Sequence, residues 1–80
     1  MRKIRADKID QDMVVQFAGL TLVKADGGEK FTAGNGTVKS YHPIDRVTEV
    51  LENELAVRIL TTKHGEVLLA PNTKVLLISE

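Results

Sequence analysis

The chain has no cysteine and no tryptophan, only two prolines, and as aromatic residues two phenylalanines and one tyrosine. The lack of cysteine excludes a disulfide framework and every thiolate metal site. Small secreted domains commonly depend on disulfides, so we expect a reducing, cytoplasmic setting. The start of the chain turns polar again at Asp7 and Lys8, without the apolar core of a signal peptide, which also argues against export.

Long apolar runs and an excess of charge of one sign are missing as well. An apolar run such as Val75–Ile78 is far shorter than the roughly 20 residues that cross a bilayer, so no membrane association is expected. Lys plus Arg and Asp plus Glu number 11 each. The chain as a whole therefore has no field that attracts nucleic acid, and any electrostatic argument must be local.

The residues that are present describe an ordinary globular protein. Hydrophobic residues make up 42% and charged residues 28% of the 80 positions, which fits a single domain over residues 1–80. A chain this short buries only roughly 60% of the surface that its unfolded form exposes. Its margin of stability is therefore small, and self-association is an expected way to enlarge it.

Short β-branched or alternating segments, separated by turn residues, predict a mostly β domain. The expected strands lie around Ile4, at residues 13–17, at 20–23, at 44–52, from Leu55, at 67–70 and at 74–79. The sequence Lys63-His64-Gly65 is expected to form a turn, with the glycine in a left-handed conformation. Short strands at regular spacing indicate a small barrel or sandwich.

Two segments carry mixed signals for a helix. Ile44, Val47 and Leu51 have helical spacing, but the β-branched residues between them and the turn-like Asn53–Glu54 favour two strands. Residues 7–12 are polar enough to form a turn or one helical turn, with Asp7 as its cap.

Residues 26–42 form the longest expected loop and contain most of the glycines. Two interpretations compete. Either the glycines allow consecutive turns around a short strand at Lys30–Thr32, or they let the backbone approach a ligand. The dipeptide Asn35–Gly36 is typical of a two-residue hairpin turn and favours the first interpretation.

Two stretches resemble a known family. The first is Arg5-Ala6-Asp7-Lys8-Ile9-Asp10-Gln11-Asp12-Met13-Val14-Val15, and the second is Arg46-Val47-Thr48-Glu49-Val50 with the hairpin that follows. They are similar to small SH3-like β-barrel proteins of actinobacteria and their phages. The resemblance implies an SH3-like barrel or sandwich of five to seven short antiparallel strands, and it implies no activity. Asp12 stands where the family has glycine, and residues 26–42 have no counterpart in it.

The sequence offers no catalytic residues, metal ligands or cofactor site that we can assign. His42 and Asp45 are three residues apart, but with His64 they are too few for a catalytic zinc site. Neither serine lies in a nucleophile motif. The glycines near Lys24 and Lys30 lack the spacing of a phosphate-binding loop. We therefore expect a protein that is not an enzyme and has no cofactor.

Two kinds of partner remain, and protein contacts with self-association are favoured. A phage-encoded regulator or inhibitor of a host protein has this character. The residues expected to bind a ligand or partner lie in the long loop and are Phe31, Asn35, Tyr41 and His42. Self-association is expected through Val75, Leu76, Leu77 and Ile78, because an 80-residue chain has little with which to cover both faces of an apolar strand. The alternative is a nucleic-acid or nucleotide-binding module that uses Arg2, Lys3, Arg5, Lys30 and Lys39.

Overall fold

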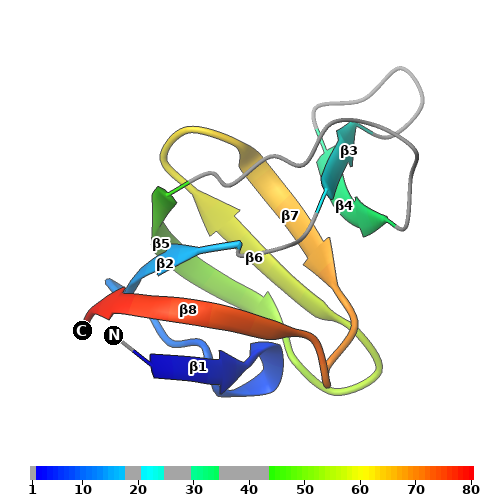
Figure 1. Ribbon diagram of the computed structural model, residues 1–80. Coiled ribbons are helices and arrows are strands. Elements are labelled where there is room, and N and C mark those ends of the chain that lie inside the picture. Colours follow the sequence, from blue (N-terminus) through cyan, green and yellow to red (C-terminus); the bar gives the residue numbers. More distant parts are fainter. Residues whose placement is uncertain (1, 18–20, 25–29, 35–43) are drawn as a thin grey trace.

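The protein is described by a computed structural model, which defines the chain at residues 2–17, 21–24, 30–34 and 44–80, with side chains at 2–17 and 44–80 (Figure 1). Eight strands account for most of these residues. They are β1 (Arg2–Arg5), β2 (Val14–Gln16), β3 (Thr21–Lys24), β4 (Lys30–Gly34), β5 (Ile44–Glu52), β6 (Val57–Thr61), β7 (Gly65–Leu69) and β8 (Lys74–Ser79). One turn of 3-10 helix, η1 (Ala6–Lys8), follows β1. The mostly β class predicted from the sequence is confirmed.

The strands form one sheet in the order β1-β8-β2-β5-β6-β7-β4-β3. Within the described residues the sheet is not closed, since β1 and β3 stand at its two ends. Neighbouring strands are antiparallel except β4 and β7, which run parallel. The structure therefore differs from the expected five to seven antiparallel strands in having eight strands and one parallel pair. Residues 30–34 form a strand inside the expected long loop, as the first interpretation of its glycines required.

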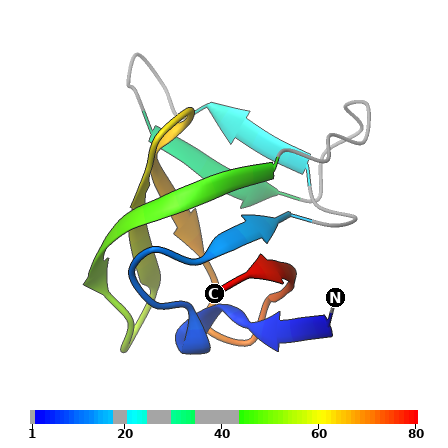
Figure 2. The same cartoon turned by 90° about the vertical axis from the view of Figure 1, so that its left-hand side faces the viewer.

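Strand β5 joins the two halves of the sheet. Its beginning pairs with β2, and from Val47 onward it pairs with β6. Irregular registers between Val47 and Glu49 and between Val50 and Glu52 let the strand bend, because bulges increase local twist. Figure 2 shows this long curved strand passing between β2 and the β6–β7 side of the molecule. The segment with mixed helix and strand signals is therefore a strand followed by a turn, as favoured.

The interior is filled by residues that alternate along the strands. Burial in β6 follows the period of two that a half-buried strand requires, with Val57, Ile59 and Thr61 pointing inward. Phe17 is fully buried at the end of β2. The apolar core comprises Ala6, Ile9, Val15, Phe17, Val47, Val57, Ile59, Val67, Leu69, Val75 and Leu77.

The polar segment after β1 forms a helical turn, but Asp7 does not cap it. Arg5 occupies the capping position, without a side-chain hydrogen bond to the turn. The Asp7 carboxylate instead accepts two hydrogen bonds from Arg5. Farther on, Asp12 has a φ of 71°, so it adopts the left-handed conformation for which the resembling family uses glycine.

Candidate functional site

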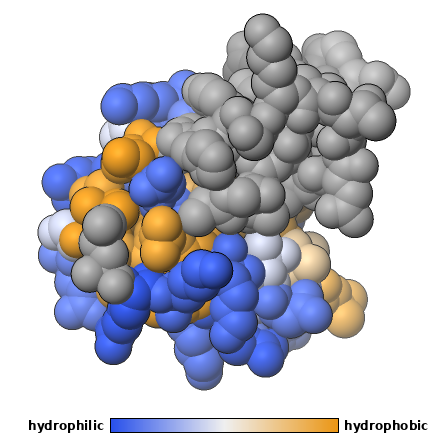
Figure 3. Space-filling view, in the orientation of Figure 1, coloured by the Kyte–Doolittle hydropathy of each residue, from blue (hydrophilic) through white to orange (hydrophobic). Residues whose placement is uncertain are grey.

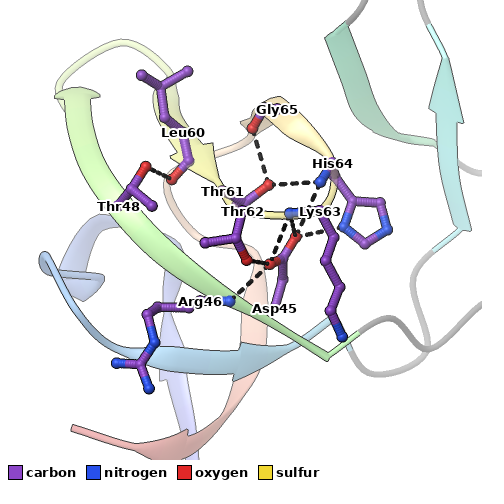
Figure 4. A network of polar contacts seen from close by, with 9 residues as sticks. All are labelled: Asp45, Arg46, Thr48, Leu60, Thr61, Thr62, Lys63, His64 and Gly65. Atoms are coloured by element: carbon purple, nitrogen blue, oxygen red, sulfur yellow. Dashed lines mark hydrogen bonds and ion pairs between the residues drawn. The ribbon is translucent and has the colours of Figure 1, made fainter.

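A buried carboxylate organises the turn between β6 and β7. Asp45 lies on β5 and is only 2% exposed. Its carboxylate accepts hydrogen bonds from the Thr62 hydroxyl at 2.6 Å and from the backbone N–H groups of Arg46 at 2.8 Å and of Lys63 and His64 at 3.1 Å. Figure 4 shows this carboxylate directed at the turn. One side chain thereby satisfies backbone donors of a turn that is distant in sequence.

The histidine of the same turn completes the network. The His64 Nδ1 atom lies 2.6 Å from Asp45 Oδ2. An ionised carboxylate only accepts hydrogen bonds, so Nδ1 is the donor. The imidazole also meets the ring of Phe17 edge-on, with the centroids 6.5 Å apart and the planes at 83°. His64 thus joins the polar network to the apolar core.

This environment keeps Asp45 ionised. Burial alone raises the pKa of the carboxyl group, but the hydrogen bonds from Thr62 and His64 outweigh it and lower the pKa from 3.8 to about 2. A carboxylate with such a low pKa and this many donors is a poor general base, because proton transfer works best with a pKa near the working pH. The arrangement is suited to fixing the turn.

The pairing of Asp45 differs from the one that the sequence drew attention to. Asp45 was considered with His42, three residues away, whereas the structure brings it to His64 through the β5–β6–β7 hairpins. His42 lies outside the described residues. No signal along the chain marks Asp45 and His64 as partners, since their contact depends on how the hairpins align.

The expected partner-binding loop falls mostly outside the part of the chain that the structure describes. Phe31 lies in β4, which pairs with β3 on one side and with β7 on the other. Asn35, Tyr41 and His42 are not described. The structure therefore neither groups nor separates these residues.

The residues of the expected nucleic-acid patch are divided in the structure. Arg2, Lys3 and Arg5 lie on β1 at one end of the strand order, while Lys30 begins β4 near the other end. Lys39 is not described. Two of the arginines are already in ion pairs, Arg2 with Glu80 at 3.2 Å and Arg5 with Asp7 at 2.9 Å. The basic charge on β1 is thereby partly balanced.

Strand β8, the predicted self-association element, lies inside the sheet and pairs with β1 and β2. Its inward residues, Val75 and Leu77, are buried in the core. Leu76 and Ile78 alternate with them on the other side and are half-buried. One face of this strand is therefore covered by the core, and the outward pair, Leu76 and Ile78, is the part available for the expected self-association.

The outward side of β8 continues across its neighbours. The pairing registers place Leu76 beside Gln16 of β2, and Gln16 in turn beside Ile44 of β5. Val14 of β2 is opposite Ser79 of β8, which directly follows Ile78 in the chain. Ile44 is 47% exposed, and Val14 is half-buried. These outward residues form what we call the outer face, which comprises Val14, Gln16, Ile44, Leu76 and Ile78.

Basic residues border the outer face. Lys3 of β1 is opposite Leu76, and Arg5 is opposite Lys74. Arg46 follows Ile44 by two positions on β5 and is exposed. Figure 3 shows apolar surface among hydrophilic residues on the side where Figure 1 places β2, β8 and the beginning of β5. The outer face is therefore a largely apolar strip, interrupted by Gln16, with basic residues along its border.

Three further points about the described residues concern surface hollows, metal-ligand clusters and membrane-spanning helices. An open hollow of about 400 Å³ lies beside the end of β8 and is lined by Arg2, Leu77, Ile78, Ser79 and Glu80. Within residues 2–17 and 44–80, no three potential metal ligands gather. No helix in the described chain has the length and apolarity needed to cross a membrane.

Comparison of the chain with protein-family models, curated proteins and solved structures found no significant match. The similarity to SH3-like proteins therefore remains a prediction from the residues quoted above.

Proposed function

We propose that this chain is a small SH3-like β-barrel that acts as a non-enzymatic binding module, through protein contacts and self-association. The outer face is its contact surface. The single observation that carries the proposal is the row of Leu76, Gln16 and Ile44 across three adjacent strands, with Ile78 and Val14 beside it. Partly exposed apolar residues that adjoin on one face are typical of interaction sites, whereas single exposed ones are ordinary.

The buried network supports a binding role over a catalytic one. Asp45 and His64 are both less than 10% exposed, and their contacts hold the β6–β7 turn. A catalytic acid or base needs to reach a substrate proton at hydrogen-bonding distance, and this carboxylate is directed at its own backbone. The polar network is thus explained by the fold, and among the side chains that the structure describes we assign the binding role to the outer face.

The test compares the wild-type chain with Ile44→Asp by sedimentation equilibrium over about 10 µM to 1 mM, the range suited to a weak interface. Ile44 is half exposed, so its replacement should leave the fold intact, which circular dichroism verifies. We expect the wild type to associate and Ile44→Asp to be monomeric. A wild type that stays monomeric over the whole range, or a variant that associates equally well, contradicts the proposed surface. The absorbance ratio at 260 and 280 nm on the same samples reports bound nucleic acid, which the alternative function predicts.

A further inference from the structure

The turn between β5 and β6 combines exposed apolar side chains with negative charge, whereas the outer face is bordered by positive charge. Leu55 lies at this turn and is 91% exposed, more than any other large apolar residue in the described chain. Leu51, at the end of β5, is 41% exposed. Glu49 precedes Leu51, Glu54 lies between the two leucines, and both glutamates are exposed. We call the segment Glu49–Leu55 the acidic tip, because it combines projecting leucines with negative charge.

From this complementarity we propose that the acidic tip of one copy of the chain docks on the outer face of a second copy. The proposal rests on the proposed function, and it identifies the segment that occupies the contact surface. Leu55 supplies the apolar anchor for the strip formed by Leu76, Ile78 and Ile44. The carboxylates of the tip face the basic border of the strip.

Charge decides between this arrangement and the packing of two outer faces. Lys3, Arg46 and Lys74 border the same face, beside Arg5, whose charge is balanced by Asp7. Bringing two such faces together therefore places like charges side by side. At the tip, Glu52 is already 3.8 Å from Arg58, whereas Glu49 and Glu54 are in no ion pair within the described residues. Those two carboxylates are available to the basic border of a neighbour.

In the observed conformation, Leu55 does not pack on the outer face of its own molecule. Its 91% exposure means that almost none of its surface contacts the rest of the chain. Each copy thus offers one tip and one face, and two copies fit together through different surfaces. Such a contact builds a chain of subunits, or closes into a dimer when two of them are related by a two-fold axis.

A turn docked on a shallow strip buries a small area, at the low end of specific interfaces. The association is therefore weak, and removal of the leucine anchor reduces the association constant on the order of tenfold or more. Leu55→Asp tests this directly. As a control, Lys63→Glu places an acid at an exposed position of the β6–β7 turn, at the other end of β6, and is expected to associate like the wild type.

Mixing two variants gives the sharper test. Leu55→Asp keeps an intact outer face, and Ile44→Asp keeps an intact tip. Sedimentation equilibrium should find each variant monomeric alone and should find association recovered in an equimolar mixture, because one correct tip-to-face contact can then form. A mixture that stays monomeric overturns the proposal.

The outcomes separate this inference from the proposed function. If Ile44→Asp abolishes association and Leu55→Asp associates like the wild type, the outer face is supported and the assignment of the tip is wrong. If Ile44→Asp also associates like the wild type, both proposals fail.

Discussion

Replacement of Asp45 by Asn tests whether this carboxylate holds the β6–β7 turn. The change conserves shape but turns one acceptor oxygen into an NH₂ group and removes the charge. Donors from Thr62, Lys63 and His64 now converge at 2.6–3.1 Å on a group that can accept fewer hydrogen bonds. Hydrogen bonds to charged groups contribute about 1.5–3 kcal/mol, and a buried donor without a partner costs about 1–3 kcal/mol.

We therefore expect Asp45→Asn to lower the free energy of unfolding by about 3 kcal/mol. For a domain of this length, that corresponds to a fall in Tm on the order of 15 °C. Thermal unfolding followed by circular dichroism at pH 7 measures it. Asp10→Asn is the matched control, because Asp10 is exposed, and its substitution should change stability by no more than about 0.5 kcal/mol. Equal Tm values for Asp45→Asn and the control would refute the role given to the network.

Three further predictions concern pH and the two left-handed positions. The pKa of Asp45 is lowered from 3.8 to about 2, so its ionised form contributes roughly 2 kcal/mol of stability above about pH 4, and this contribution is lost as the pH falls toward 2. In urea titrations, the difference in free energy of unfolding between wild type and Asp45→Asn should accordingly decrease from pH 4 to pH 2. A difference that stays constant over this range contradicts the assignment. Gly65 has a φ of 66°, so Gly65→Ala should cost about 1 kcal/mol in thermal unfolding, and an unchanged Tm argues against that conformation. At Asp12, with a φ of 71°, the glycine variant should be about 1 kcal/mol more stable than the alanine variant, and the reverse order in denaturant unfolding speaks against a left-handed residue.

The strand pattern was largely accessible from the sequence because local signals and tertiary structure agree. Alternation in Val57–Thr61 and the turn at His64–Gly65 both match the structure. For residues 44–52, the β-branched side chains outweighed the helical spacing, as expected for a strand that pairs first with β2 and then with β6. At Asp12, which stands where the resembling family has glycine, the left-handed φ of 71° is one that aspartate tolerates better than most residues.

Contacts between residues far apart in the sequence were harder to predict from the sequence. The parallel contact of β4 with β7 joins segments separated by two further strands, and nothing in the local sequence specifies it. Asp45 was associated with the nearby His42, while its partner is His64, 19 residues away. Leu76 and Ile78 were singled out within an apolar run, but only the pairing registers show that they join Ile44 and Val14 on one face.

The central claim is that the outer face contacts a partner, and concentration-dependent NMR tests it most directly. Amide chemical shifts of the wild-type chain recorded from about 10 µM to 1 mM cover the range of a weak interface. The account predicts progressive shifts at Val14, Leu76, Ile78 and Ile44, with no change in the buried turn at His64. Shifts that do not depend on concentration, or that move only at residues away from this face, would contradict it.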